Sequence, residues 1–362
     1  MEKRALLCTI TQKPGHGGIA RVSSLVWGIA QGQFGDSCEL LVAASRQADT
    51  ITFFDKLNFC SKVIKRQIFG RCDLLFFDHL GLARVQTLLP AALRRPYGVF
   101  LHAVEAWSTL NPNRLQALVE AKVRVANSKY TADRVAAAHP EVGEIEVCHL
   151  ALGLGIEAAG RKTGEFYCCS PESVISRIHA NSILIVGRII KNERWKGHDE
   201  LISAWPLVVL KVPNAQLVVV GGGDDIPRLR ALAEQLDVSA SILFTGHVDD
   251  RTLQQIYSRV AAFAMPSRAE GFGIVYLEAM HHRLPCIGSV RDAAREIIVD
   301  GETGFLVDQS DRAELAAKVI LLLTDPFLRA RMGYSGFERL RTSFSLEQFQ
   351  VRMRQVFEKL SA

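Results

Sequence analysis

The chain has 362 residues, of which 48% are hydrophobic, and this length is enough for two globular domains of ordinary size. The first apolar run, residues 5–10, is too short for the centre of a signal peptide, and polar residues interrupt the other runs well before 18 positions. We therefore expect a cytoplasmic protein that is neither secreted nor membrane-spanning. The eight cysteines include no C-x-x-C pair, which fits a reducing compartment and disfavours a thiolate metal centre.

The net charge of +5 comes from the first part of the chain. Residues 1–165 hold 20 Lys and Arg against 15 Asp and Glu, while the remainder is balanced at 23 each. Within that part, residues 56–95 contain eight basic side chains and only two acidic ones, among Phe, Leu, Ile and Val. Such a stretch suits an anionic membrane surface, where each basic residue contributes about 1 kcal/mol. A solvated helical face is the alternative, and nucleic acid is disfavoured because no recognised binding motif accompanies the charge.

Short apolar runs rich in β-branched and aromatic residues alternate with helical patterns along the whole chain. Runs of this kind favour parallel strands that are covered on both faces, in an α/β fold. Five runs fall in the first half of the chain and five in the second, which predicts two sheets. The runs are ALLCTI (5–10), CELLVAA (38–44), DLLFFD (73–78), YGVFLH (97–102), VRVANS (123–128), ILIVGR (183–188), AQLVVVGG (215–222), SILFTG (241–246), AAFAMPS (261–267) and LPCIGS (284–289).

The domain boundary is predicted between the two groups of strands. Residues 153–180 lack clear periodicity and mix Gly, Ser and Pro with charges, as linkers do. We expect one domain over residues 1–165 and a second over residues 166–344. The tail, residues 345–362, has apolar residues at helical spacing and is predicted to be a closing helix on the N-terminal domain. Because doubly wound sheets bind ligands beyond the carboxyl ends of their strands, we expect a binding cleft between the domains.

Two glycine-rich turns follow predicted strands. TQKPGHGGIARV (11–22) presents backbone N–H groups at a helix N-terminus, where a phosphate is favoured, although packing alone also explains such a turn. VVVGGGDD (218–225) has Ile226 where a dinucleotide fingerprint needs its third glycine. We interpret this second turn as structural, and an oxidoreductase is therefore disfavoured.

Two cations lie near the end of one predicted strand, in the segment IVGRIIKNERWKGHDELI (185–202). Arg188 follows the strand directly, and Lys196 precedes the next helix. A guanidinium group grips phosphate oxygens with two hydrogen bonds, and an ammonium group adds a point charge. The segment therefore predicts a phosphate site, with a solvated loop as the alternative.

A pair of carboxylates lies in the segment AEGFGIVYLEAM (269–280). Glu270 precedes a helix that we expect to begin near Gly273, and Glu278 lies one turn after Ile274 on the same face. Carboxylates accept hydrogen bonds from vicinal hydroxyls while helix-end amides hold anionic oxygens, and each such bond contributes about 1.5–3 kcal/mol. A nucleotide sugar offers these groups. Capping by Glu270 and a solvated Glu278 are the alternative.

The Glu-x7-Glu element and its surroundings resemble those of retaining family 4 glycosyltransferases, of the glycosyl transferases group 1. The resemblance covers essentially the whole chain, through motifs in the same order: GHGGIARV, FLHAVEAW (100–107), VANSKYTADRV (125–135), LFTGHVDD (243–250) and DGETGFLV (300–307). It implies the GT-B architecture of two facing Rossmann-like domains with a deep cleft between them. The loop GSVRDAAREI (288–297) departs from the family's Gly-Gly-Pro-Glu type of sequence, and Glu296 stands where the family has a glutamate.

The resemblance also implies roles for individual residues. Glu278 would bind the ribose, Glu270 the hydroxyls of the transferred sugar, and Lys196 the diphosphate, together with Arg188. His102 matches a family histidine near the donor sugar, although a lone histidine after a strand is more often a core or loop residue. The implied donor-binding residues are Gly17, Gly18, Arg188, Lys196, His247, Val248, Glu270, Gly271, Phe272, Gly273, Ile274, Val275 and Glu278, and the implied catalytic residues are His102, Arg188, Lys196 and Glu270.

The activity that the resemblance implies is retaining transfer of a hexose from a nucleoside-diphosphate sugar to a glycan or lipid-linked acceptor in polysaccharide biosynthesis. UDP-glucose is the first choice of donor and GDP-mannose the second. No Asp-x-Asp occurs and no His, Cys and Asp cluster has metal spacing, so we expect neither a metal nor a cofactor. The alternatives are a non-catalytic nucleotide-sugar-binding protein, a GT-B-type epimerase and a phosphorylase. The region 56–95 would place the protein peripherally on the inner face of the cell membrane.

Overall fold

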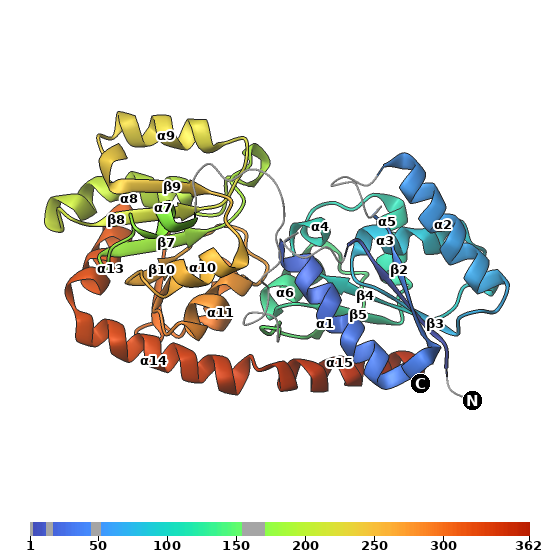
Figure 1. Ribbon diagram of the computed structural model, residues 1–362. Coiled ribbons are helices and arrows are strands. Elements are labelled where there is room, and N and C mark those ends of the chain that lie inside the picture. Colours follow the sequence, from blue (N-terminus) through green and yellow to red (C-terminus); the bar gives the residue numbers. More distant parts are fainter. Residues whose placement is uncertain (1–2, 12–16, 45–51, 154–170) are drawn as a thin grey trace. The chain divides into compact units, whose positions relative to one another are not determined.

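The computed structural model describes residues 3–11, 17–44, 52–153 and 171–362, which form two compact units (Figure 1). Unit 1 comprises Met1–Gly153 together with Leu346–Ala362, and unit 2 comprises Leu154–Ser345. Each unit is built on a parallel sheet with helical connections. The predicted α/β class with two Rossmann-like domains is therefore confirmed. The expectation of a cleft between the domains stays a prediction.

The described part of unit 1 contains a six-stranded parallel sheet in the order β2-β1-β3-β4-β5-β6. The strands are β1 (Ala5–Thr9), β2 (Cys38–Val42), β3 (Leu74–Phe77), β4 (Tyr97–Leu101), β5 (Val123–Ala126) and β6 (Glu146–Val147). Every residue of β1, β3 and β4 is buried, as expected for parallel strands with helices on both faces. The chain passes from β1 to β2 on one side of it, and then to β3 on the other side of β1. The topological switch point therefore lies between β1 and β3.

The helices of unit 1 connect these strands, and the last helix of the chain returns to pack on them. They are α1 (Gly17–Phe34), α2 (Phe53–Ile68), α3 (Leu80–Ala83), α4 (Val104–Trp107), α5 (Pro112–Val119), α6 (Lys129–Ala138) and α15 (Leu346–Ser361), with 3-10 turns η1 (Gly35–Ser37), η2 (Arg84–Leu88) and η3 (Ala91–Leu93). The ring of Phe357 in α15 lies 5.7 Å from that of Phe34 and 5.2 Å from that of Phe76. Figure 1 shows α15 beside α1, and the predicted closing helix is confirmed.

The described part of unit 2 contains a second six-stranded parallel sheet, in the order β12-β11-β10-β7-β8-β9. The strands are β7 (Ser182–Val186), β8 (Gln216–Val220), β9 (Ile242–Gly246), β10 (Ala262–Ala264), β11 (Cys286–Ser289) and β12 (Gly304–Val307). Starting from β9, this is the 3-2-1-4-5-6 order of the dinucleotide-binding fold, with its switch point between β7 and β10. Each of the ten apolar runs overlaps a strand, whereas β6 and β12 were not predicted.

The helices of unit 2 follow the loops that hold the candidate site residues. They are α7 (Pro171–Ile175), α8 (His198–Lys211), α9 (Ile226–Gln235), α10 (Asp250–Tyr257), α11 (Ile274–His281), α12 (Ala294–Ile297), α13 (Arg312–Thr324) and α14 (Pro326–Ser343), with 3-10 turns η4 (Lys191–Glu193) and η5 (Ser239–Ser241). Within the part of the chain that the structure describes, every helix is too short or too polar to cross a lipid bilayer.

Candidate functional site

The two loops at the switch point of unit 2 carry most of the residues that the sequence singled out. The loop after β7 holds Arg188 and Lys196, and the loop after β10 holds Glu270 and leads into α11. β7 and β10 are hydrogen-bonded neighbours, so their carboxyl ends open on the same edge of the sheet. In open α/β sheets this is the place where ligands bind.

Backbone contacts fix these two loops to each other. The Arg268 amide donates a hydrogen bond of 2.8 Å to the carbonyl of Trp195. Gly197, which caps α8 at a φ of 94°, lies so close to Pro266 that a Cβ there would be 2.9 Å from the Pro266 nitrogen. Glycine is therefore required at 197 both for its left-handed backbone and for the close approach.

Lys196 and Glu270 form an ion pair across the switch point, with 3.2 Å between Nζ and Oε2. Their side chains are 17% and 20% exposed, so the pair is half-buried but open to solvent on one side. The aliphatic part of Lys196 lies over Gly187, the residue after β7. The arrangement offers an ammonium group and a carboxylate side by side, for a phosphate and for sugar hydroxyls respectively.

Arg188 behaves differently from Lys196. It is 70% exposed and donates to Glu193, with 2.5 Å between Nη2 and Oε1. The two predicted phosphate ligands thus come from one loop but pair with different carboxylates. Because Glu193 is 13% exposed, its pairing holds the arginine against the loop that carries it.

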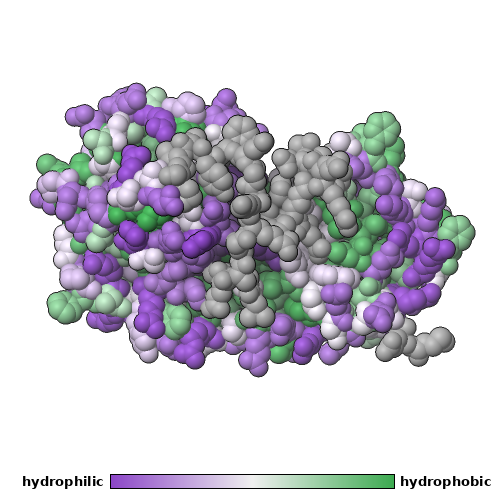
Figure 2. Space-filling model, in the orientation of Figure 1, coloured by the Kyte–Doolittle hydropathy of each residue, from purple (hydrophilic) through white to green (hydrophobic). Residues whose placement is uncertain are grey.

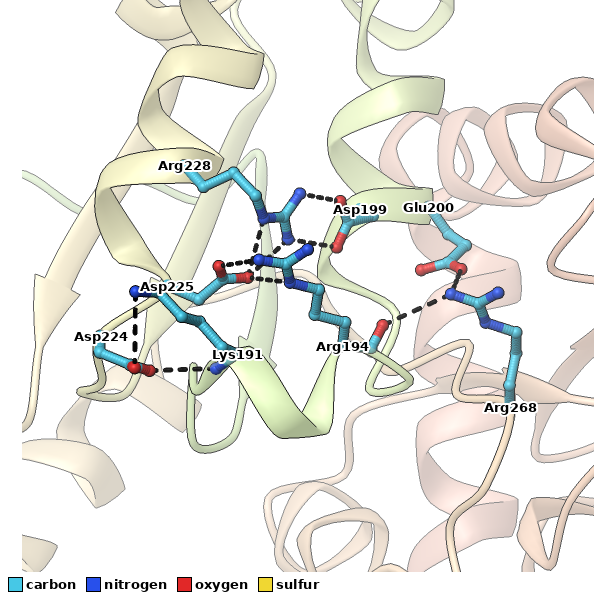
Figure 3. A network of polar contacts seen from close by, with 8 residues as sticks. All are labelled: Lys191, Arg194, Asp199, Glu200, Asp224, Asp225, Arg228 and Arg268. Atoms are coloured by element: carbon cyan, nitrogen blue, oxygen red, sulfur yellow. Dashed lines mark hydrogen bonds and ion pairs between the residues drawn. The ribbon is translucent and has the colours of Figure 1, made fainter.

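A polar network anchors the loop that carries Lys196 (Figure 3). The carboxylate of Asp225, which is 2% exposed, accepts hydrogen bonds from Arg194 at 2.8 and 3.0 Å and from Arg228 at 2.7 and 2.9 Å. Arg228 also donates to Asp199 in the first turn of α8, at 2.5 and 2.9 Å. The arginines lower the pKa of Asp225. The network thereby ties Arg194 and Asp199, which flank Lys196 in the sequence, to the start of α9.

The same network reaches the second loop of the switch point. Arg268 pairs with Glu200 of α8, with 3.1 Å between Nη2 and Oε1. Burial raises the pKa of Glu200. On the opposite side, Lys191 donates its amide to Asp224 at 3.0 Å. Ion pairs therefore connect the loops after β7 and β8, and a further ion pair ties the loop after β10 to α8.

The helix after Glu270 begins as predicted. Gly273 caps α11 at a φ of 91°, and the helix runs from Ile274. A Cβ at Gly273 would lie 2.6 Å from the Tyr276 ring, so this position also requires glycine. The side chain of Phe272 is buried and meets the Phe344 ring edge-on at 5.9 Å. The turn is thus anchored by an apolar side chain, and the first helical amides have no partner within the helix itself.

Glu278 is buried in α11, at 2% exposure, so the alternative of a solvated carboxylate is wrong. The Tyr257 hydroxyl donates a hydrogen bond of 2.9 Å to Glu278 Oε2. The Tyr257 ring lies parallel to that of His282, with 5.4 Å between centroids. A buried carboxylate is costly unless it is hydrogen-bonded, and Tyr257 supplies such a bond.

Three residues of unit 2 near this edge were missed by the sequence analysis. Asp292, after β11, is fully buried beside Glu270, and burial raises its pKa to about 8. Burial lowers the pKa of His198 to about 4, with a smaller contribution from Lys196. Tyr257 is the third. A rule that inspects every polar residue within three positions of a strand end would have found Asp292.

The remaining predicted positions of unit 2 lie after the edge strand β9 and at the start of α11. His247 is exposed and Val248 is buried, directly after the edge strand β9. A Cβ on Gly222 would approach the His247 Cβ to 3.6 Å, which places the ends of β8 and β9 together. Val275, like Ile274, is partly exposed at the start of α11. Gly271 is buried. The role of each as a donor contact stays a prediction.

The interpretation of VVVGGGDD as a structural turn has a direct cause. A Cβ on Gly221 would lie 1.8 Å from the Gly187 carbonyl oxygen, and one on Gly223 would lie 2.0 Å from the Ile189 oxygen. Both glycines have φ values near 150°. They are needed because the chain after β8 crosses the chain after β7 without room for side chains.

In unit 1, a buried polar cluster occupies the corresponding edge. His102, 7% exposed, follows β4, and its Nε2 lies 2.7 Å from the carbonyl oxygen of Asp78 after β3. A carbonyl only accepts, so Nε2 carries the proton. Glu105 accepts the amides of His102 and Ala103 at 2.5 and 2.9 Å. His102 is a strand-end residue in a built polar environment.

The Asp78 carboxyl is fully buried. It accepts a hydrogen bond of 2.5 Å from Thr9 at the end of β1. Burial raises its pKa to about 6. Gly17 is the first residue of α1 and Gly18 is exposed, whereas the preceding residues of the predicted phosphate turn, 12–16, lie outside the described residues.

Comparisons with known proteins agree with this picture of the fold. Residues 176–339 match the family model "Glycosyl transferases group 1", so this part of the chain is a domain of that family. The whole chain resembles two solved structures at low sequence identity. They are HepE from Anabaena in complex with UDP and glucose (18% identical, 98% of this chain and 99% of that chain, TM-score 0.74) and sucrose-phosphate synthase from Thermosynechococcus elongatus (19%, 98% and 98%, 0.75). The two Rossmann-like domains therefore match GT-B glycosyltransferase structures.

Curated relatives match over part of their length. A GDP-mannose-dependent monoacylated alpha-(1-6)-phosphatidylinositol monomannoside mannosyltransferase from Corynebacterium glutamicum is 36% identical over 170 residues, which are 45% of this chain and 44% of that protein. The capsular polysaccharide biosynthesis glycosyltransferase CapM from Staphylococcus aureus is 32% identical over 164 residues, 44% of this chain and 41% of that protein. The chain thus spans about half the length, or less, of the curated relatives that it matches.

Proposed function

We propose that this protein is a glycosyltransferase that moves a hexose from a nucleoside-diphosphate sugar to a glycan or lipid-linked acceptor. The observation that carries the proposal is the Lys196–Glu270 pair at the switch point between β7 and β10, beside the N-terminus of α11. An ammonium group, a carboxylate and helix-end amides at one edge suit a diphosphate joined to a polyol. The group 1 domain match supports this reading.

In the proposed reaction, the bond between the anomeric carbon and the diphosphate oxygen breaks while the acceptor oxygen bonds to the same carbon. The acceptor's proton leaves with the diphosphate. Negative charge grows on the diphosphate, and Lys196 stabilises it once its ammonium group has exchanged Glu270 for a diphosphate oxygen. Glu270 orients the sugar. We infer retention of the anomeric configuration and no need for a metal ion, as the family resemblance implies.

A donor screen tests the proposal. GDP-mannose is our first choice of donor, because it is the donor named for the C. glutamicum relative. UDP-glucose, which the sequence analysis favoured, is the second. We expect the wild type to bind and turn over one of them with a suitable acceptor, to give an α-linked product by NMR, and to stay active in EDTA. Glu270→Ala should abolish turnover, and Glu234→Ala, on the exposed face of α9, should not.

Other outcomes of this screen would replace the proposal. Tight donor binding without turnover across many acceptors would establish the non-catalytic binding protein. Conversion of the donor to another hexose without an acceptor would establish the epimerase. If none of the nucleotide sugars binds, the proposal is wrong.

We further propose that the protein docks on an anionic membrane through α2. This helix buries Phe59, Val63 and Gln67 against the unit but leaves large apolar side chains in solvent. These are Phe53 (68% exposed), Phe54 (80%), Leu57 (51%), Ile68 (50%) and the following Phe69 (70%). Figure 2 shows hydrophobic surface over this helix, on the right of the view. Exposed Lys56, Lys62 and Lys65 on the same helix favour anionic lipid.

The charge of the basic region is smaller at the surface than the sequence indicates. Arg66 pairs with Glu39, and Arg94 pairs with Glu120, both of them acids from outside residues 56–95. The apolar residues therefore contribute more to the proposed docking than the net charge does. Their position on one short helix is typical of an interfacial helix.

Sedimentation with vesicles tests the docking proposal. We expect vesicles that contain phosphatidylglycerol to retain the wild type at low salt, and the double variant Phe53→Ser/Phe54→Ser to remain in the supernatant. Phe327→Ser is the matched control, because Phe327 is 85% exposed in unit 2. Equal retention of all three proteins, or no retention of the wild type, would contradict docking through α2.

A further inference from the structure

Each glutamate of the Glu-x7-Glu pair is hydrogen-bonded by a buried side chain that lies outside the predicted donor contacts, Glu270 through its backbone and Glu278 through its carboxylate. Asp292, from the loop after β11, holds the backbone of Glu270, and Tyr257, from α10, holds the side chain of Glu278. We propose that these two are positioning residues for donor binding, Asp292 for the sugar end of the donor and Tyr257 for the nucleoside end. The inference rests on the proposed function.

Asp292 grips residue 270 through its backbone. Its Oδ2 accepts the Glu270 amide at 3.3 Å, while its Oδ1 accepts the Ala294 amide at 2.9 Å. The next residue, Ala293, donates its amide to the Glu270 carbonyl at 3.3 Å. Both backbone groups of Glu270 are therefore tied to the loop after β11, in the segment whose sequence departs from the family pattern.

The residues around Asp292 hold its side chain in one position. It is fully buried, and the Ser267 hydroxyl, from the other end of the Glu270 loop, also bonds to its carboxyl. Burial raises its pKa to about 8, with Glu270 adding to the shift. Burying a carboxyl group is costly, and the hydrogen bonds that Asp292 makes at both ends of this loop offset that cost. Glu296, the glutamate suggested from the family pattern, is half-buried and lies on α12.

Tyr257 acts on the other carboxylate through its hydroxyl, at 2.9 Å from Glu278 Oε2. The tyrosine itself cannot turn away, because its ring is fully buried, stacked on His282 and 6.3 Å from the Phe263 ring of β10. His282 is fixed in turn by Gln254, with 2.5 Å between Nε2 and Oε1. A packed aromatic stack thus selects one rotamer of Glu278.

The two positions predict different losses, because the two glutamates are proposed to contact different parts of the donor. Loosening Glu270 weakens contacts to the transferred hexose, which the free nucleoside diphosphate lacks. Loosening Glu278 weakens contacts to the ribose, which both ligands contain. A general loss of folding would weaken the binding of both ligands, so the selective loss expected for the Asp292 variant separates positioning from a merely structural role. For the Tyr257 variant, weaker binding at an unchanged thermal unfolding temperature makes that separation.

The test is calorimetric titration of the full chain with GDP-mannose and with GDP, and in parallel with UDP-glucose and UDP. Asp292→Asn keeps the shape but replaces one accepting oxygen by a donor that opposes a backbone N–H. We expect it to raise the Kd of the nucleotide sugar about tenfold and to leave that of the diphosphate unchanged. Tyr257→Phe removes one hydroxyl and should raise both Kd values about tenfold.

Matched controls come from exposed residues of the same kinds. Asp308→Asn breaks an exposed ion pair with Arg291 next to the Asp292 loop, and Tyr334→Phe changes an exposed tyrosine of α14. Both should bind as the wild type does. If Asp292→Asn is too unstable to titrate, Ser267→Ala, which removes one hydrogen bond to the same carboxyl, should show the same selective loss.

Two results would overturn the inference while leaving the proposed function intact. One is Asp292→Asn and Ser267→Ala binding both ligands with wild-type affinity or losing both equally. The other is Tyr257→Phe binding both as the wild type does. If the wild type itself binds no nucleotide sugar, the proposed function fails first, and this inference fails with it.

Discussion

The switch-point edges of the two units are built from different chemistry. In unit 2 the edge presents half-buried charged groups, Lys196 and Glu270, backed by an ion-pair network around Asp225. In unit 1 the edge is a buried cluster, in which Asp78 and His102 are 0% and 7% exposed and form hydrogen bonds within the unit. Charged groups near solvent can exchange their protein partners for a ligand. Buried groups that are hydrogen-bonded within the unit contribute to its structure instead. The comparison places the proposed donor chemistry in unit 2.

The largest expected effect tests the charged edge. Lys196→Met removes the ammonium group that is proposed to stabilise the leaving diphosphate and leaves Glu270 without this partner. Loss of one preorganised donor typically costs about 10²–10³ in rate, so kcat/KM should fall by that factor. Lys211→Met, at the exposed end of α8, is the control and should retain full activity. Steady-state kinetics with the selected donor measures both.

A second prediction concerns the sealed edge in unit 1. The pKa of Asp78 is raised by burial from 3.8 to about 6, so the stability that comes from its neutral form is complete below pH 3.8 and is lost as the pH rises through about 6. At about 1.4 kcal/mol per pH unit, the loss amounts to at most about 3 kcal/mol. Urea unfolding of Asp78→Asn at pH 4 and pH 7 should lack this loss.

The comparison with wild type is essential because His79 titrates in the same range. Burial lowers its pKa to about 4, so folding favours the neutral ring, and its contribution to stability is lost as the pH falls from about 6.5 to 4. The difference between the variant and the wild type cancels that opposite trend. Asp133→Asn, an exposed partner of Lys129, is the control and should follow the wild type. An Asp78→Asn profile parallel to the wild-type profile would contradict a buried Asp78 with a raised pKa.

A third prediction sharpens the geometry of unit 2. Gly273→Ala places a Cβ at a left-handed position, which costs about 1–2 kcal/mol, and pushes it against the Tyr276 ring. Gly301→Ala has a similar φ of 76° but open space around it, so it should cost only the conformational part. We expect thermal unfolding to show the larger loss for Gly273→Ala, together with weaker donor binding. Equal losses would mean that crowding at the α11 turn is unimportant.

The smallest expected effect tests the network behind Lys196. Arg194 is 47% exposed, and Arg228 still pairs with Asp225 when Arg194 is replaced, so Arg194→Met should lower stability by only about 1 kcal/mol. Arg341→Met, which breaks an exposed pair with Glu338, should cost less. A loss in donor affinity for Arg194→Met alone would show that the network orients Lys196. Identical affinities in both variants would limit the network to stability.

The two sheets could be predicted from the sequence because buried parallel strands consist of apolar runs. Ten strands and the closing helix were recovered in this way, while β6 is two residues long and β12 is hidden in a glycine-containing turn. Among the site residues, Lys196 and Glu270 were found since they flank a strand end and a glycine turn. Their direct pairing, by contrast, depends on the order of β7 and β10 in the sheet, which no local pattern encodes.

The residues that the sequence analysis missed share a physical reason. Asp292 and Asp78 each lie within three positions of a strand end, where a search for polar residues would find them, but their contacts and that of Tyr257 form only once distant segments pack together. Tyr257 lies 21 residues from Glu278, and Asp78 lies 69 residues from Thr9. Local spacing carries information over one or two helical turns, so contacts of this kind are beyond its reach.

The most direct test of the account is a crystal structure of the protein with a bound nucleotide sugar. The account predicts that Lys196 Nζ contacts a diphosphate oxygen, that the hexose hydroxyls bond to Glu270, and that the ribose lies at Glu278 near the start of α11. A donor bound away from the edge formed by β7 and β10, with the Lys196–Glu270 pair untouched, would contradict it.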